Sequence, residues 1–313
     1  MMDQAQFDGF VQEFEQARDG QGNPLAMHHL LVRQGDAEFV HRFGGRTEPS
    51  DIRSISKTVM SLLAGIVADR NDDFGMDMPV WPVLERVTTL TTIENLPRLQ
   101  KLTVQHLLTH TIGYDQVLMM RGDLAGLDPQ QYVNHVVNTP IPHEPGQHYL
   151  YSNAGFYLLS VVLQEYLGED LYAFADRELF TPLGIEKPEW ERYGTYLAGA
   201  TRLWLQPEDL RQIGLLLLDD GGDLVSADWV QQLRRPTTLT PHVDTPTNPY
   251  FRRHAYAHGM WLGEKDGIHF GHGTDGQTLA VVPACRAVVV TTSHQVDVVR
   301  LEEIVDRIVA ACY

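Results

Sequence analysis

Lysine and cysteine are both scarce in this chain of 313 residues. It has four lysines and two cysteines, and its net charge is −17 at neutral pH. No run of Lys or Arg supplies the basic surface that binds phosphates, so nucleic acid is excluded as an expected partner. Cys285 lies in a strand-like run and Cys312 in the last three residues, so no disulfide framework is indicated. Both are predicted to be plain packing or tail residues, and redox chemistry is not expected.

Long apolar runs are also absent. The longest falls far short of the ~20 residues that cross a bilayer, and the first twenty residues, MMDQAQFDGFVQEFEQARDG, lack the apolar centre of a signal peptide. We therefore expect a cytoplasmic protein with no membrane partner.

Two catalytic motifs are missing. No Gly-x-Ser-x-Gly occurs, which argues against a conventional Ser-His-Asp hydrolase, and no His-Glu-x-x-His occurs. His254 and His258 lie one helical turn apart, and His28 and His29 are adjacent, so a metal site stays an alternative. The main expectation is a protein with no metal and no cofactor.

Hydrophobic periodicity predicts an α+β fold. It favours a helix over residues 4–18, two strands over 25–33 and 37–43, and a helix over 54–70. Short helical segments cut by Pro and Gly follow as far as residue 245, then strands, and a helix over 296–311. This order predicts a sheet built from both ends of the chain with a helical region inserted between them.

One short stretch of the helix over 54–70 carries chemistry. In SDIRSISKTVMSLLAGIVADR, Ser54 and Lys57 lie one helical turn apart at the start of an apolar stripe. A lysine that is desolvated against that stripe has a lowered pKa and can accept a proton from the serine, whose oxyanion the helix dipole favours. The alternative is structural: Ser54 caps the helix and Lys57 extends along the surface.

A second candidate stretch is EPGQHYLYSNAGFYLL, in which a Pro-Gly turn leads to Tyr151-Ser152-Asn153 just before an apolar helix. A loop tyrosine beside an amide can move a proton and orient a substrate carbonyl. The competing match, Tyr132-Val133-Asn134, lies in a predicted helix, where its side chains would point to different faces. We select residues 151–153, with a packed tyrosine as the alternative.

The third candidate stretch is IHFGHGTDGQTLAVVP, a glycine-rich bend between late strands that carries His269, His272, Asp275 and Gln277. Its glycines allow close approach of a ligand, and a strand N–H there can serve as a second oxyanion donor beside that of Ser54. A plain hairpin turn is the alternative.

Together, and in this order along the chain, these motifs resemble the serine β-lactamase and penicillin-binding protein superfamily. The resemblance is closest to the branch that holds class C β-lactamases, D-aminopeptidases, β-lactamase-like esterases and 6-aminohexanoate-dimer hydrolases. The segments LTVQHLLTHTIGY, LFTPLGIEKPEW and QPEDLRQIGLLLLDDGG add to it, so that it extends from about residue 20 to the end of the chain. It implies one β-lactamase-like catalytic domain over residues 1–313, with an antiparallel sheet flanked by helices. Its α/β lobe would comprise roughly 1–60 and 250–313, and its mainly helical lobe roughly 75–245.

The resemblance also implies roles for individual residues. Ser54 would be the acylated nucleophile, Lys57 its activating partner and Tyr151 the proton shuttle. Asn153 would contact a substrate amide, and His272-Gly273-Thr274 would line the site as its strand motif.

This strand motif departs from the family pattern at two positions. Thr274 stands where glycine is usual, so the second oxyanion N–H falls either to Asp275 or to Gln277. His272 stands where β-lactamases usually have lysine, which weakens recognition of an antibiotic's carboxylate and favours esterase or amidase activity.

The expected function is that of a serine hydrolase acting on a small ester, amide or peptide-like molecule. The alternatives are a β-lactamase or D,D-peptidase and, from another class, a catalytically silent member that only binds a ligand. The segments 112–130 and 237–256 are expected to set the specificity.

Overall fold

The computed structural model describes residues 1–120, 122–239, 255–263 and 267–313. The chain divides into two compact units. The first comprises Met1–Ile55, Leu203–Asp223 and Ala227–Tyr313, and the second comprises Ser56–Arg202 and Leu224–Ser226.

An antiparallel sheet forms the first unit. Within the described residues its strand order is β2-β1-β12-β11-β10-β9-β8-β7. The strands are β1 (Met27–Gln34), β2 (Ala37–Arg42), β7 (Thr238–Leu239), β8 (Ala255–Ala257), β9 (Met260–Leu262), β10 (His269–Gly273), β11 (Gln277–Val282) and β12 (Ala287–Ser293). A separate pair joins β3 (Ser50–Asp51) to β6 (Trp204–Leu205). Every residue of β11 and β12 is buried, which explains why QTLAVV and AVVVTTS are rich in valine and threonine rather than alternating in polarity.

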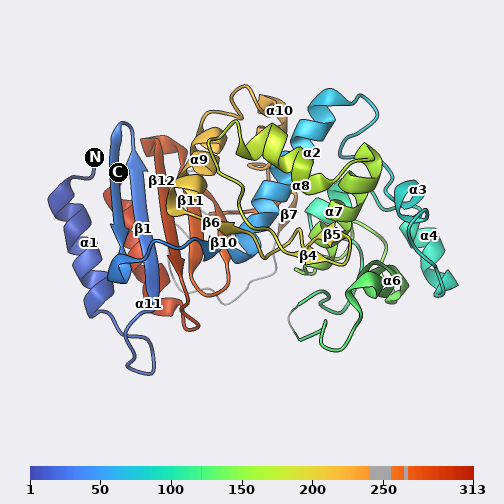
Figure 1. Ribbon diagram of the computed structural model, residues 1–313, viewed down its shortest axis with the longest axis horizontal. Helices are drawn as coiled ribbons and strands as arrows, with labels where there is room; N and C mark the ends of the chain where they lie inside the picture. Colours follow the sequence, from blue (N-terminus) through green and yellow to red (C-terminus); the bar gives the residue numbers. More distant parts are fainter. Residues whose placement is uncertain (121, 240–254, 264–266) are drawn as a thin grey trace. The chain divides into compact units, whose positions relative to one another are not determined.

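Helices cover both faces of this sheet (Figure 1). On one face, Gly214 of α9 (Pro207–Leu218) lies directly against the side chains of Val288 and Leu279. On the other face lies α11 (Val299–Ala311), which packs against α1 (Gln4–Gln16). The unit also contains α10 (Ala227–Gln232) and the 3-10 turns η1 (Phe43–Gly45), η2 (Arg53–Ile55) and η6 (Pro283–Cys285).

The second unit is mainly helical. It contains α2 (Ser56–Arg70), α3 (Trp81–Leu84), α4 (Leu96–Leu99), α5 (Val104–Leu108), α6 (Tyr132–Asn138), α7 (Ala154–Leu167) and α8 (Leu171–Ala175), with the short strands β4 (Arg192–Tyr193) and β5 (Tyr196–Leu197). Its irregular turns are η3 (Ile93–Asn95), η4 (Pro129–Gln131) and the π-helical η5 (Asp176–Phe180). Residues 56–67 of α2 and 154–163 of α7 are all buried, so these are the central helices of the unit.

The predicted α+β class is confirmed, with the early hairpin and the late strands joined in one sheet. The helix predicted over 54–70 differs at its start, because a 3-10 turn occupies Arg53–Ile55 and the α-helix begins at Ser56. Such turns are common at helix N-termini. The interpretation as a single catalytic domain with the predicted lobe boundaries stays a prediction.

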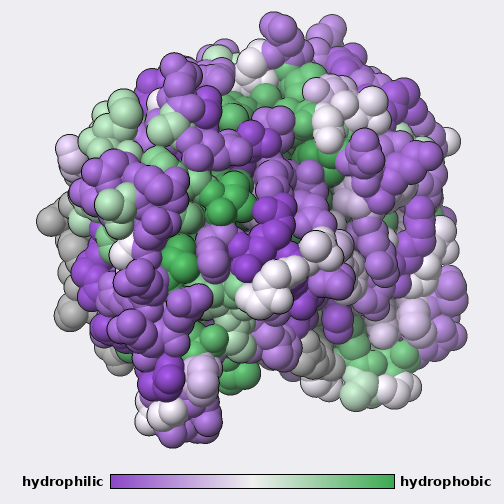
Figure 2. Space-filling model, turned by 60° about the vertical axis from the view of Figure 1, so that its left-hand side comes forward, coloured by the Kyte–Doolittle hydropathy of each residue, from purple (hydrophilic) through white to green (hydrophobic). Residues whose placement is uncertain are grey.

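Most of the face drawn in Figure 2 is hydrophilic, with small hydrophobic areas scattered over it. In the part of the chain that the structure describes, no helix has both the length and the apolar character needed to span a bilayer.

Candidate active site

Ser54 lies in the 3-10 turn η2, directly before the start of α2 in the chain, and is partly exposed. The residue before it, Arg53, has a φ of 52°. A non-glycine residue in this region costs about 1–3 kcal/mol and persists only where the surroundings hold it.

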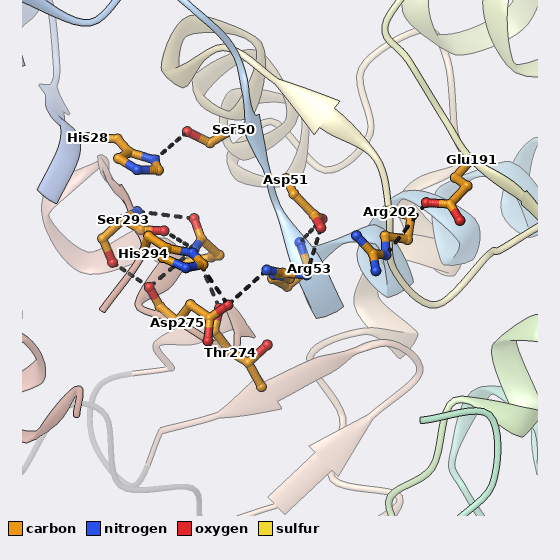
Figure 3. Close-up of polar contacts among 11 residues, drawn as sticks. His28, Ser50, Asp51, Arg53, Glu191, Arg202, Thr274, Asp275, Ser293 and His294 are labelled. Carbon is orange, nitrogen blue, oxygen red and sulfur yellow. Dashed lines mark hydrogen bonds and ion pairs between the residues drawn. The ribbon is translucent and has the colours of Figure 1, made fainter. Parts of the chain in front are cut away.

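Two carboxylates hold Arg53 in this conformation (Figure 3). Its guanidinium lies 2.9 Å from Asp51 Oδ2 and 2.9 Å from Asp275 Oδ2, and its side chain is only 12% exposed. Its backbone N–H donates to Asp51 Oδ1 at 2.9 Å. These bonds tie the turn of Ser54 to the connection between β10 and β11. Arg53 and Asp51 were not among the predicted site residues, because nothing local in SDIRS indicates a pairing with a residue more than 200 positions away.

Gly273 brings the end of β10 against the same turn. A Cβ atom there would lie 2.7 Å from the carbonyl oxygen of Ile52 and 2.8 Å from Arg53 Cβ, closer than real Cβ atoms come. Only glycine allows this approach. Thr274, the next residue, is exposed, and Asp275 has a φ of 68°.

The side chain of Gln277 braces this bend. It is buried, and its Nε2 donates to the carbonyl oxygens of Ser293 at 2.7 Å and Asp275 at 3.2 Å. Ser293 also donates from its hydroxyl to the Asp275 carbonyl (Figure 3). The choice between the N–H groups of Asp275 and Gln277 as oxyanion donor stays open.

The ring of His272 lies on the opposite face of β10 from Gly273, because successive residues of a strand point to opposite sides. Its Nε2 is 2.7 Å from Glu302 Oε1 on α11. The structure therefore places the His272 ring on the α11 face and the Ser54 turn on the Gly273 face. A contact between this ring and a substrate stays a prediction.

In the second unit, Lys57 is completely buried on α2. Its Nζ donates to Asn153 Oδ1 at 2.7 Å and to the carbonyl oxygen of Ala200 at 3.2 Å. It also lies 4.9 Å from the centroid of the Tyr151 ring and 5.9 Å from that of Phe156.

Burial lowers the pKa of Lys57 from 10.5 to about 7, because the charged form loses its hydration. The acceptors described above are neutral amide and carbonyl oxygens, which offset that loss less than a carboxylate would. Near neutral pH, a large fraction of the protein therefore carries Lys57 as a neutral amine, which can accept a proton.

The backbone around Gly199 brings the Ala200 carbonyl to the lysine. Gly199 has a φ of 67°, and a Cβ atom there would lie 2.4 Å from the carbonyl oxygen of Phe156 on α7. Glycine therefore permits the close packing that delivers this acceptor.

The loop Tyr151-Ser152-Asn153 lies directly before α7, as predicted. Ser152 Oγ accepts from the Leu118 N–H at 3.0 Å and donates to the Leu118 carbonyl at 2.9 Å. Asn153 Nδ2 donates to the Met119 carbonyl at 3.0 Å, while its Oδ1 accepts from the lysine. Asn153 therefore orients Lys57, and its contact with a substrate amide stays a prediction.

His110, which was not among the predicted site residues, lies beside Tyr151. It is buried, and its ring centroid lies 4.4 Å from that of Tyr151. Its Nδ1 accepts from the Ser152 N–H at 3.5 Å. Burial, and then the nearby charge of Lys57, hold its pKa well below the ordinary value, so the ring is neutral. In the sequence, His110 stands between two threonines after a short predicted helix. In the structure its φ is 57°, a backbone conformation that histidine adopts more readily than most residues.

The sequence profile of the beta-lactamase family matches residues 30–311. The chain belongs to the beta-lactamase family. The resemblance inferred from the motifs is confirmed, and the family is one of serine hydrolases.

Solved structures share the fold at low identity. A candidate β-lactamase of Bacteroides dorei DSM 17855 is 15% identical with a TM-score of 0.76, covering 99% of this chain and 100% of its own. A penicillin binding protein from Bacillus halodurans is 17% identical with a TM-score of 0.69, covering 97% and 99%. EstCE1, a hydrolase with promiscuous acyltransferase activity, is 16% identical with a TM-score of 0.73, covering 98% of each chain.

In this member of the beta-lactamase family, the competing match Tyr132-Val133-Asn134 makes packing and structural contacts. Tyr132 is buried on α6, with its ring centroid 5.5 Å from that of Tyr193 and 6.5 Å from that of Tyr157. Asn134 accepts from the Thr89 N–H at 2.8 Å.

The alternative of a metal site requires several ligand side chains close together. Among the described residues, no group of three His, Cys, Asp or Glu side chains could hold a metal ion. His254 lies outside those residues. His29 Nδ1 lies 2.7 Å from Thr292 Oγ1, and His28 Nδ1 lies 2.9 Å from Ser50 Oγ (Figure 3).

Proposed function

We propose that this protein is a serine hydrolase that cleaves an ester or amide through an acyl-enzyme on Ser54. The observation that carries the proposal is the buried Lys57, whose pKa falls to about 7 and whose Nζ is held by Asn153 and Ala200. Burying an amine in this way is costly for a purely structural residue and useful for a base.

In the proposed reaction, Ser54 Oγ attacks the substrate carbonyl while the neutral amine of Lys57 accepts its proton. The phenol of Tyr151 relays a proton to the leaving group, and backbone N–H groups stabilise the tetrahedral oxyanion. Water then attacks the acyl group and frees Ser54. The roles of all three side chains come from the motifs and the family resemblance, and the lysine's surroundings support them.

An esterase or amidase is favoured over a β-lactamase or D,D-peptidase. His272, which stands at the position where lysine is usual in β-lactamases, is bonded to Glu302. EstCE1, a structure with the same fold, is a hydrolase with acyltransferase activity. The predicted cytoplasmic location and the small ester, amide or peptide-like substrate are part of this proposal.

The test is intact-mass spectrometry after incubation with activated esters, β-lactams and a fluorophosphonate. We expect an adduct of one acyl or phosphonyl group per chain with the esters and the fluorophosphonate, located on Ser54 by peptide mapping. Ser54→Ala should give no adduct and no turnover while its Tm stays close to that of the parent. Ser61→Ala is the matched control on the buried part of α2 and should keep the adduct.

The outcomes separate the alternatives. Acylation by β-lactams alone would favour the β-lactamase or D,D-peptidase. A folded parent that takes no adduct from any reagent would favour the silent ligand-binding member. An adduct that persists in Ser54→Ala would refute the nucleophile assignment.

A further inference from the structure

The two cysteines, separated by 26 residues in the sequence, come together in the first unit. Cys285 is the last residue of η6, in the connection between β11 and β12, and is partly exposed. Cys312 directly follows α11 and is 2% exposed. Cys285 Sγ lies 3.8 Å from the carbonyl oxygen of Val282, and Cys312 Sγ lies 3.4 Å from that of Ile308. Each thiol is the largest influence on the pKa of the other.

Backbone contacts place the two segments together independently of the thiols. Gln34 at the end of β1 pairs with Ala287 of β12, and the N–H of Gly35 donates to the carbonyl of Arg286 at 3.1 Å. The buried side chain of Gln34 donates from Nε2 to the carbonyl oxygen of Cys312 at 2.5 Å. One glutamine therefore holds the residue after α11 beside the connection that carries the other cysteine. Figure 1 shows the C-terminus at the top of β1.

The two thiols differ in reactivity. The neighbouring Cys312 thiol lowers the pKa of Cys285, because it stabilises the thiolate. The neighbouring Cys285, together with burial, raises the pKa of Cys312. Cys285 is thus the more accessible and the more readily ionised thiol, with a protonated thiol next to it, which is the arrangement of redox-sensitive cysteine pairs.

We propose that Cys285 and Cys312 are a modification site that forms a reversible intramolecular disulfide when a peroxide oxidises Cys285. In the first step, the Cys285 thiolate attacks the O–O bond of hydrogen peroxide, which gives a sulfenic acid and releases hydroxide. In the second step, Cys312 sulfur attacks the sulfenic sulfur, its thiol proton leaves with the hydroxyl group as water, and the S–S bond forms. The two thiols lose two electrons, which the peroxide takes up.

The disulfide would join the end of α11 to the sheet. The bond closes the loop of chain between Cys285 and Cys312, which restricts the unfolded chain. The oxidised protein should therefore be the more stable form. Because α11 also carries Glu302, the partner of His272, the bond would fix the helix that holds this histidine.

The test uses the parent protein treated with hydrogen peroxide, then denatured and labelled with N-ethylmaleimide. The reduced chain should take two labels, one on each of its two cysteines. The oxidised chain should take none, remain monomeric without reductant, and regain both labels after dithiothreitol. Its Tm should rise by about 5 °C. Non-reducing digestion should yield a linked peptide pair containing both cysteines, which identifies the bond without any variant.

Serine variants separate the two steps. In Cys312→Ser, peroxide should leave a sulfenic acid on Cys285 that dimedone traps. In Cys285→Ser, the buried Cys312 should keep its label after peroxide. Retention of both labels in the peroxide-treated parent, a covalent dimer, or equally fast oxidation of Cys312 in Cys285→Ser would overturn the proposal.

Discussion

Replacing Lys57 with methionine tests whether burial lowers the pKa of this lysine. Methionine has a similar length and no charge, so Lys57→Met removes the cost of burying the amine while nearly filling its space. It also leaves Asn153 Oδ1 and the Ala200 carbonyl without this donor, which costs about 1–3 kcal/mol each. That loss does not depend on pH, whereas the cost of burying the charge does.

The magnitude follows from the two pKa values of Lys57. A fall from 10.5 to about 7 corresponds to about 5 kcal/mol between the charged and the neutral form. Below pH 7 both folded and unfolded chains hold the proton, and this destabilisation is fully present. Between pH 7 and pH 10 only the unfolded chain holds it, so the parent's free energy of unfolding rises with pH. From pH 6 to pH 9.5 the parent should gain about 3 kcal/mol relative to Lys57→Met.

The assay is urea denaturation of both proteins at several pH values, with unfolding monitored by tryptophan fluorescence. Each pH gives one difference in the free energy of unfolding, and groups that titrate alike in both proteins cancel. Lys101→Met is the matched control. Lys101 is 61% exposed, so Lys101→Met removes no buried charge and should not reproduce the change seen with Lys57→Met over the same range.

A constant difference between parent and Lys57→Met from pH 6 to pH 9.5 would refute the reasoning. It would mean that Lys57 keeps an ordinary pKa in the folded protein. The amine would then be charged at neutral pH and unable to act as the proposed base.

The remaining predictions concern activity. Because Lys57 must be neutral to accept a proton, kcat/KM for an activated ester should fall about tenfold per pH unit below its pKa of about 7 and level off above it; a flat profile from pH 5 to pH 8 would contradict the role. Tyr151→Phe should lower kcat by roughly 10² to 10⁴-fold with little change in KM, whereas Tyr132→Phe, at a packed position, should stay within a few-fold of the parent. The reverse pattern would overturn the choice of motif. Gly273→Ala should lower both activity and Tm, because its Cβ would lie 2.7 Å from the carbonyl that precedes η2. Gly75→Ala, whose Cβ would have nothing within 4 Å, should leave both unchanged. Equal effects of the two substitutions would contradict the close approach at Gly273.

Much of the fold could be predicted from the sequence because periodicity records which face of an element is buried. The valine-rich runs of β11 and β12 and the apolar stripe of α2 each identify their element locally. The order of the three motifs was enough to predict the family. The start of α2 was missed by two residues, since helix boundaries depend on turn geometry that Arg53 and its partners impose.

The properties of the candidate site could be predicted less well than the fold, because they depend on contacts between residues far apart in the sequence. The sequence by itself determined that a serine and a lysine lie three residues apart before an apolar helix. Only the tertiary structure decided that Lys57 loses all contact with solvent and that Asn153 and Ala200 accept its hydrogen bonds. It also decided that the segments carrying Cys285 and Cys312 lie together at the end of β1. The physical reason is that a pKa or a thiol pairing depends on desolvation and distance, and both are set by which distant segments pack together.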